Sequence, residues 1–111
     1  MKYKNTIQKG SIRFIVFREN DAWYAVGLEF NIVEAGDNPQ EAFILLMEAV
    51  QGYLESAYKI KARPNILNQR PDAEYETMWN LLQGQKKKIL NNVFASGYLN
   101  LVRKNMEFVP A

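Results

Sequence analysis

The sequence predicts an α+β domain in which a three-stranded antiparallel β-meander is covered by one long helix. Two apolar segments joined by a short polar turn, a third apolar segment, and a strongly capped helical segment follow one another along the chain. With 111 residues, the chain has the length of a single domain. Residues 11–58 form the predicted β-β-β-α core, and residues 59–111 form a C-terminal extension.

The first strand is predicted over residues 11–19, where β-branched and aromatic residues dominate. Apolar residues occupy both alternating sets of positions in this segment, with Ile12, Phe14 and Val16 in one set and Ile15 and Phe17 in the other. A strand that is apolar on both sides is expected to be central, or buried on both faces.

A second strand is predicted over residues 22–30, because Asn20-Asp21 is a turn signal that makes it the return strand of a hairpin. Strict alternation places four residues on one face of this strand, namely Trp23, Ala25, Gly27 and Glu29. A short third strand is predicted over residues 32–35, ending at Gly36.

The long helix has the clearest local signal in the chain. Asn38 is a suitable N-cap, Pro39 suits the first helical position, and Glu41 completes a capping box. Apolar residues recur at helical spacing from there to Ala57, so the helix is predicted over residues 39–57. Gly52, inside this segment, suggests a close approach of two backbones.

The C-terminal extension contains a second predicted helix, over residues 72–83, which begins at an Asp72 cap and stops near Gly84. Trp79 lies on its apolar stripe, which favours a core position. Residues 86–104 fit either a short helix or a strand, and their pattern does not decide between the two.

The composition argues against several classes of function. The chain has no cysteine and no histidine, so it lacks the commonest general base and the commonest metal ligands. We therefore expect no enzymatic activity, no metal and no cofactor. No segment is apolar for long enough to cross a bilayer, and the N-terminal residues do not resemble a signal peptide, so we expect a cytoplasmic protein without membrane contact.

Charge is distributed unevenly along the chain. Residues 1–58 carry five Lys/Arg against eight Asp/Glu, a net charge of −3, whereas residues 59–111 carry nine against four, a net charge of +5. Such asymmetry can indicate two surfaces with different partners. The densest basic run is Lys86, Lys87 and Lys88, which could contact nucleic-acid phosphates or simply form a solvated loop.

The first half resembles the HicB family of antitoxin-type proteins over about residues 12–58. The features that carry the resemblance are a residue pair at the end of the second strand, a glycine, a cap and a Glu-Ala step opening a long helix, here Leu28-Glu29, Gly36, Asn38, Glu41-Ala42 and Tyr53-Leu54. The resemblance implies a partial ribonuclease H-like fold without nuclease activity. It also implies a partner, a small basic ribonuclease toxin of the HicA type, and in many relatives a DNA-binding segment for autoregulation of transcription.

Two hypotheses for function follow. The first is a non-catalytic antitoxin-type module that binds and neutralises a small basic toxin, with Trp23 and Glu29 as the expected partner-binding residues. The second is an orphan module that self-associates and has a structural or regulatory role without toxin or DNA. Because one helix covers only one face of a sheet that is apolar on both, a homo-oligomer is expected, unless the C-terminal half folds back over the second face.

Overall fold

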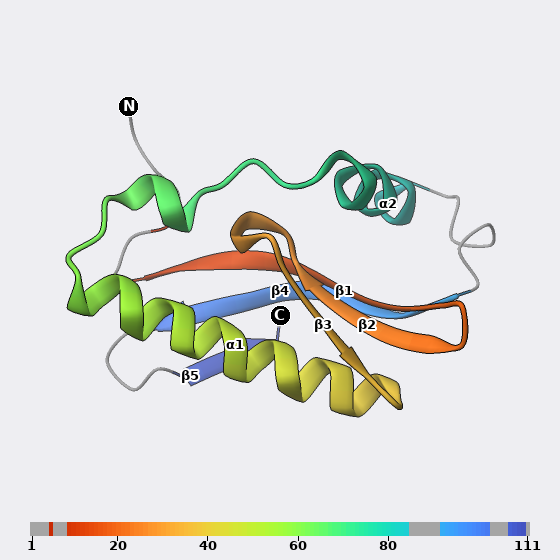
Figure 1. The fold of residues 1–111 in the computed structure, drawn as a ribbon. Helices are drawn as coiled ribbons and strands as arrows, with labels where there is room; N and C mark the ends of the chain where they lie inside the picture. Colours follow the sequence, from red (N-terminus) through yellow and green to blue (C-terminus); the bar gives the residue numbers. More distant parts are fainter. Residues whose placement is uncertain (1–4, 6–8, 85–91, 103–106, 111) are drawn as a thin grey trace.

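A five-stranded antiparallel sheet with the strand order β3-β2-β1-β4-β5 lies between helices on its two faces (Figure 1). The computed structural model describes residue 5 and residues 9–84, 92–102 and 107–110. The strands are β1 (Lys9–Glu19), β2 (Ala22–Gly27), β3 (Ile32–Gly36), β4 (Val93–Val102) and β5 (Glu107–Pro110). The helices are α1 (Pro39–Lys59) and α2 (Ala73–Gln83), with short 3-10 turns η1 (Leu28–Phe30) and η2 (Pro64–Leu67). The predicted α+β class is confirmed.

Strand β1 is the central strand, as its two apolar faces predicted, and pairs with β2 on one side and β4 on the other. Ile12, Phe14 and Val16 belong to the core under α1, whereas Ile15 and Phe17 belong to a second core on the opposite face. The predicted turn between β1 and β2 is present. Asn20 and Asp21 both have positive φ, of 53° and 65°, which is the backbone that a two-residue hairpin loop requires.

The second strand is shorter than predicted, because it ends at Gly27 and the chain continues into η1. Strict alternation would have placed Leu28 and Phe30 on the same face. In the structure, Leu28 is buried in the core under α2, whereas Phe30 is buried under α1, where its ring lies 4.8 Å from that of Tyr53. The 3-10 turn allows both side chains to be buried on opposite faces, and it removes Glu29 from the strand.

Helix α1 begins at the predicted cap and continues two residues beyond the predicted end. The Asn38 side chain accepts a hydrogen bond from the Glu41 backbone N–H at 2.8 Å. The Glu41 carboxylate accepts from the backbone N–H of Asp37 at 2.9 Å, one residue before the cap. The side chains that the helix buries against the sheet lie on one stripe: Ala42, Leu46, Val50, Leu54 and Ala57.

The close approach of backbones predicted at Gly52 is wrong. Gly52 is exposed, and a Cβ atom there would have no neighbour within 4 Å. The close approach occurs instead at Gly36, where a Cβ atom would lie 2.7 Å from the backbone nitrogen of Ala42. Glycine at position 36 therefore allows β3 to pass directly into the first turn of α1.

The C-terminal half folds back onto the sheet. The predicted helix of residues 72–83 is present as α2, with the Asp72 side chain accepting from the Glu74 backbone N–H at 3.0 Å. Trp79 and Leu82 of α2 are buried against Ile15, Phe17 and Val26 on the face of the sheet that α1 leaves uncovered. Trp79 is thus a core residue, as its position on the apolar stripe predicted.

The C-terminal extension, expected to be helical with residues 86–104 left open between helix and strand, is only partly helical, because residues 93–102 form strand β4 and residues 107–110 form β5. Strand β4 pairs along the free edge of β1, satisfying backbone groups that a three-stranded meander would have left open. The fold-back of the C-terminal half also removes the argument for a homo-oligomer, since α2 covers the second apolar face. Among the described residues, no helix is both long and apolar enough to span a membrane.

Candidate functional site

Helix α1 leaves part of its own face of the sheet uncovered. It packs on β3, β2 and the adjoining side of β1, whereas β4 lies beyond it. At this place the ladder between β1 and β4 is irregular: Val16 pairs with Ala95 and Phe17 pairs with Val93, so Phe94 is an extra residue. Such a β-bulge re-aims a side chain, and here it places Phe94 beside the N-terminal half of α1.

An apolar groove of about 380 Å³ lies between this bulge and α1. Among the described residues that line it, Gln40 alone is polar, and these residues are Phe14, Val16, Pro39, Gln40, Phe43, Ile44, Phe94 and Ala95. The rings of Phe14 and Phe43 pack with centroids 5.0 Å apart. Ile44 on α1 and Phe94 on β4 are 51% and 55% exposed, so apolar surface is accessible on both walls. The groove has the composition of a site for an apolar side chain.

Trp23, predicted to bind a partner, is half-buried and packs against the core under α1. Its ring meets Phe94 edge-on, with centroids 6.0 Å apart, but Trp23 does not itself line the groove. Trp23 therefore supports one wall of the groove. Phe94 was not predicted as a binding residue, because its exposure depends on a bulge that no residue pattern in β4 marks.

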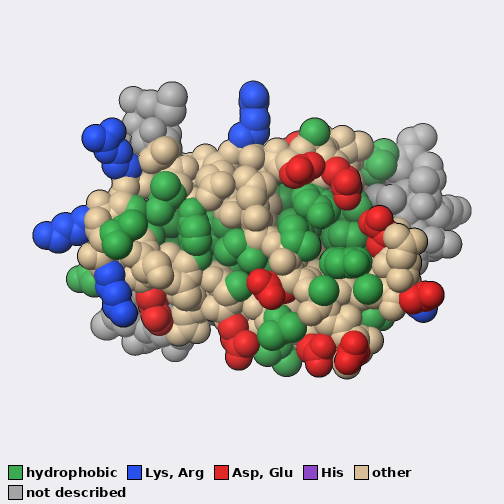
Figure 2. All heavy atoms as spheres, viewed as in Figure 1, with side chains coloured by type: hydrophobic (Ala, Val, Ile, Leu, Met, Phe, Trp, Pro, Cys, Tyr) green, Lys and Arg blue, Asp and Glu red, His purple; other side chains and the backbone are tan. Residues whose placement is uncertain are grey.

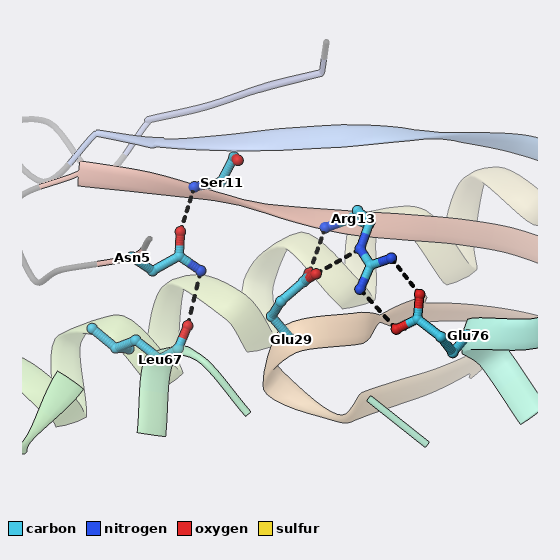
Figure 3. Close-up of polar contacts among 6 residues, drawn as sticks. All are labelled: Asn5, Ser11, Arg13, Glu29, Leu67 and Glu76. Carbon is cyan, nitrogen blue, oxygen red and sulfur yellow. Dashed lines mark hydrogen bonds and ion pairs between the residues drawn. The ribbon is translucent and has the colours of Figure 1, made fainter. Parts of the chain in front are cut away.

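The prediction that Trp23 and Glu29 share one face is wrong, because Glu29 lies on the α2 side of the sheet (Figure 3). One oxygen of Glu29 accepts from the Arg13 backbone N–H at 2.8 Å, and the other accepts from Arg13 Nε–H at 2.6 Å. Both carboxylate oxygens are thus engaged within the chain, and the Glu29 side chain is only 13% exposed. This geometry assigns Glu29 a role in holding the fold together.

Arg13 also joins β1 to α2. Its two terminal nitrogens donate to the carboxylate of Glu76 at 2.6 and 3.0 Å, and its guanidinium lies 5.5 Å from the centroid of the Trp79 ring (Figure 3). The hydrogen bonds from Arg13 lower the pKa of Glu76, although its partial burial opposes that shift. The hydrogen bond to Glu76 also raises the pKa of Arg13, against the opposing effect of burial. The network fixes α2 on the sheet with a planar, bidentate contact.

A second buried polar cluster is centred on Asn5, which is fully buried. Its side chain accepts from the Ser11 backbone N–H at 2.7 Å and donates to the Leu67 carbonyl at 2.8 Å (Figure 3). Gly10 lies against this side chain, so closely that a Cβ atom at position 10 would overlap the amide of Asn5. The sequence did not single out Asn5, because a lone asparagine near the N-terminus has no periodicity to mark it.

Charged side chains are unevenly distributed over the surface of the molecule, as they are along the chain. Lys and Arg side chains gather mostly where α1 ends, at the left of Figure 2, whereas Asp and Glu gather along α1 and toward the other end. From Pro39 to Ser56, the charged residues of α1 are all acidic, namely Glu41, Glu48 and Glu55. Glu41 and Glu48 lie three residues before and four residues after Ile44, the spacings of helix-surface neighbours. Ile44, at the exposed edge of the groove, is therefore bordered on the helix surface by two acidic residues, although neither of them lines the groove itself.

The remaining sequence-predicted residues, Lys86, Lys87 and Lys88, lie outside the described residues. Within the described ranges, no group of three or more His, Cys, Asp or Glu side chains is arranged to hold a metal ion. Comparisons of the chain with protein-family models, with curated proteins and with solved structures give no match.

Proposed function

We propose that this chain is a non-catalytic, antitoxin-type protein that binds a small basic protein partner at the groove between α1 and β4. The observation that carries the proposal is an accessible apolar groove whose exposed residue Ile44 has the acidic residues Glu41 and Glu48 as its neighbours on the surface of α1. The HicB-like sequence pattern of residues 12–58 supports the same proposal and suggests a ribonuclease toxin of the HicA type as the partner.

The two parts of the site have different roles in binding. The acidic surface attracts and orients a basic partner, which mainly raises the association rate. Exposed ion pairs contribute only about 0–1 kcal/mol each, so they do not hold the complex together. An apolar side chain of the partner that enters the groove contributes more, because burying a large aliphatic or aromatic side chain is worth about 1.5–3 kcal/mol. We therefore place the anchor of the complex between Ile44 and Phe94.

The proposal involves no chemistry by this chain. Inhibition of a ribonuclease needs only that a surface required for RNA binding is covered. The network of Glu29, Arg13 and Glu76 joins η1, β1 and α2 on the opposite face of the sheet, so in this proposal it stabilises the fold and takes no part in binding. Autoregulation through the basic Lys86–Lys88 run is a further part of the proposal and rests on sequence alone.

The test is co-expression with a small basic protein encoded beside this gene, followed by affinity purification and measurement of growth rescue. Phe94→Ser and Ile44→Ser are expected to abolish co-purification and rescue. Val33→Ser is the matched control, since Val33 is 42% exposed but lines a different pocket. If the wild-type chain neither co-purifies with that neighbour nor suppresses its toxicity, the antitoxin proposal is wrong.

A further inference from the structure

The most exposed large hydrophobic side chain among the described residues is Ile60, which is 73% exposed. Ile60 is the C-cap of α1 and lies between Lys59 and Lys61, with Arg63 two residues further along. None of these three cations forms an ion pair within the part of the chain that the structure describes. Residues 59–63, called the basic corner below, thus present an apolar side chain among free positive charges.

The basic corner and the groove are complementary in both respects. The groove offers Ile44 and Phe94, the two next most exposed large hydrophobic residues, and Glu41 and Glu48 lie beside Ile44 on the surface of α1. Isolated exposed apolar residues are common on protein surfaces, but here the neighbours of Ile60 along the chain are lysines, whereas the helix-surface neighbours of Ile44 are glutamates, so the nearest charges are of opposite sign.

The two patches of one molecule cannot meet. They lie at opposite ends of α1, a helix of 21 residues, which at about 1.5 Å per residue is about 30 Å long. The basic corner can therefore occupy only the groove of another molecule. The charge separation along the molecule in Figure 2 favours side-by-side pairing of two copies in opposite directions.

We propose that the groove receives the basic corner of a second copy of this chain, with Ile60 between Ile44 and Phe94, and with Lys61 and Arg63 near Glu41 and Glu48. When each molecule inserts its Ile60 into the other, the contact closes as a two-fold symmetric dimer. This inference does not rest on the proposed function. The two proposals are linked in one respect: a partner protein that occupies the groove must displace the second copy of the chain.

The dimer is expected to be weak and sensitive to salt. Each contact consists of one aliphatic side chain and a few exposed charges, and interfaces below about 1,200 Å² are typical of transient complexes. Sedimentation velocity between roughly 10 µM and 1 mM is the appropriate measurement at such affinities. The wild-type chain should shift from monomer to dimer over this range, and Ile60→Asp should remain monomeric at every concentration.

Charge reversal gives the sharper experiment. Glu41→Lys/Glu48→Lys reverses the charge beside Ile44 at the edge of the groove, and Lys61→Glu/Arg63→Glu reverses the charge of the basic corner. Each double variant alone should be monomeric, because its groove and corner carry the same sign. An equimolar mixture should form a heterodimer, because both contacts in it are again between opposite charges. Thermal unfolding checks that each variant is folded, since Glu41 also accepts a hydrogen bond from Asp37.

The matched control is Glu19→Lys/Glu74→Lys, which adds the same charge near the pocket of Tyr24 and Tyr75, away from the groove. Mixed with Lys61→Glu/Arg63→Glu, it should give no heterodimer. A wild-type chain that stays monomeric at about 1 mM would overturn the inference. So would an equimolar mixture of the two charge-reversed double variants that forms no heterodimer. Neither outcome affects the proposed function, which is decided by co-purification with a different protein.

Discussion

Phe94 packs edge-on against Trp23, with ring centroids 6.0 Å apart and ring planes at 81°. Trp23 comes from β2 and Phe94 from β4, on either side of the central strand β1. Because the bulge leaves Phe94 without a pairing partner on β1, the ring of Trp23 is what supports it. Both residues therefore shape the groove, but the half-buried Trp23 should contribute more to stability than the exposed Phe94.

Trp23→Ala is expected to lower the free energy of unfolding by about 2–4 kcal/mol, somewhat less than the usual cost of truncating a fully buried tryptophan, because Trp23 is half-buried. It should also weaken any partner complex by about 2 kcal/mol, because Phe94 loses its support. Phe94→Ala should weaken the complex by a similar amount while lowering stability by only about 1 kcal/mol, since its ring is half exposed. Urea unfolding and calorimetric titration measure the two effects. Equal stability losses for both variants would contradict this division.

Gly52→Ala is expected to raise the free energy of unfolding by about 0.5–1 kcal/mol. Gly52 lies inside α1, is exposed, and would place its new Cβ atom in open space, so only the gain in helix propensity remains. Gly36→Ala is the matched comparison and should destabilise, because its Cβ atom would lie 2.7 Å from a backbone nitrogen. Thermal unfolding of the two variants checks both signs, and a destabilising Gly52→Ala would show that the glycine has a role the monomer does not explain.

The sequence predicted those elements whose signals are local. The turn at Asn20-Asp21, the cap at Asn38 and the apolar stripe of α1 depend on neighbouring residues, and each lies where it was predicted. The two apolar faces of β1 also correctly placed that strand at the centre of the sheet.

The features that sequence did not reveal depend on pairing between distant segments. Residues 93–102 become a strand because β1 has a free edge, and Phe94 is exposed because of a bulge in that pairing. Glu29 was placed on a strand face by alternation, but a 3-10 turn and Arg13 direct it to the α2 side. Tertiary contacts outweighed the local pattern at these positions.

Glu76→Gln is expected to make stability less dependent on pH in the acidic range. Hydrogen bonds from Arg13 lower the pKa of Glu76 in the folded protein. The ionised carboxylate therefore stabilises the fold fully above the pKa of the unfolded state, about 4.3, and this contribution is lost as the pH falls through the lower pKa of the folded state. Urea unfolding from pH 7 to about pH 3 measures the effect. Glu74→Gln is the control, because Glu74 has no ion pair among the described residues; identical pH profiles for both variants would refute the assignment.

Asn5→Ala is expected to lower the free energy of unfolding by about 2 kcal/mol or more. Its removal leaves the Ser11 N–H and the Leu67 carbonyl without their partner, and an unsatisfied buried group costs about 1–3 kcal/mol. Asn80→Ala, at an exposed position of α2, should be neutral or slightly stabilising. Equal stabilities of the two variants would show that the Asn5 contacts do not hold the N-terminal segment to η2.

The purified protein is expected to cleave neither RNA nor DNA, with or without divalent metal ions. A ribonuclease H-type site needs several carboxylates that converge on two metal ions. Here both oxygens of Glu29 are bound to Arg13, and Asp21 lies at the hairpin tip, paired with Arg18 at 3.2 Å. Freeing Glu29 would leave Arg13 partly uncompensated, so recruitment to a metal would cost stability. The measurement is a cleavage assay with Mg²⁺ and Mn²⁺ on the wild-type chain, Glu29→Gln and Asp21→Asn. Cleavage that co-elutes with the folded wild-type protein and disappears in either variant would establish a catalytic role and overturn the binding-only account.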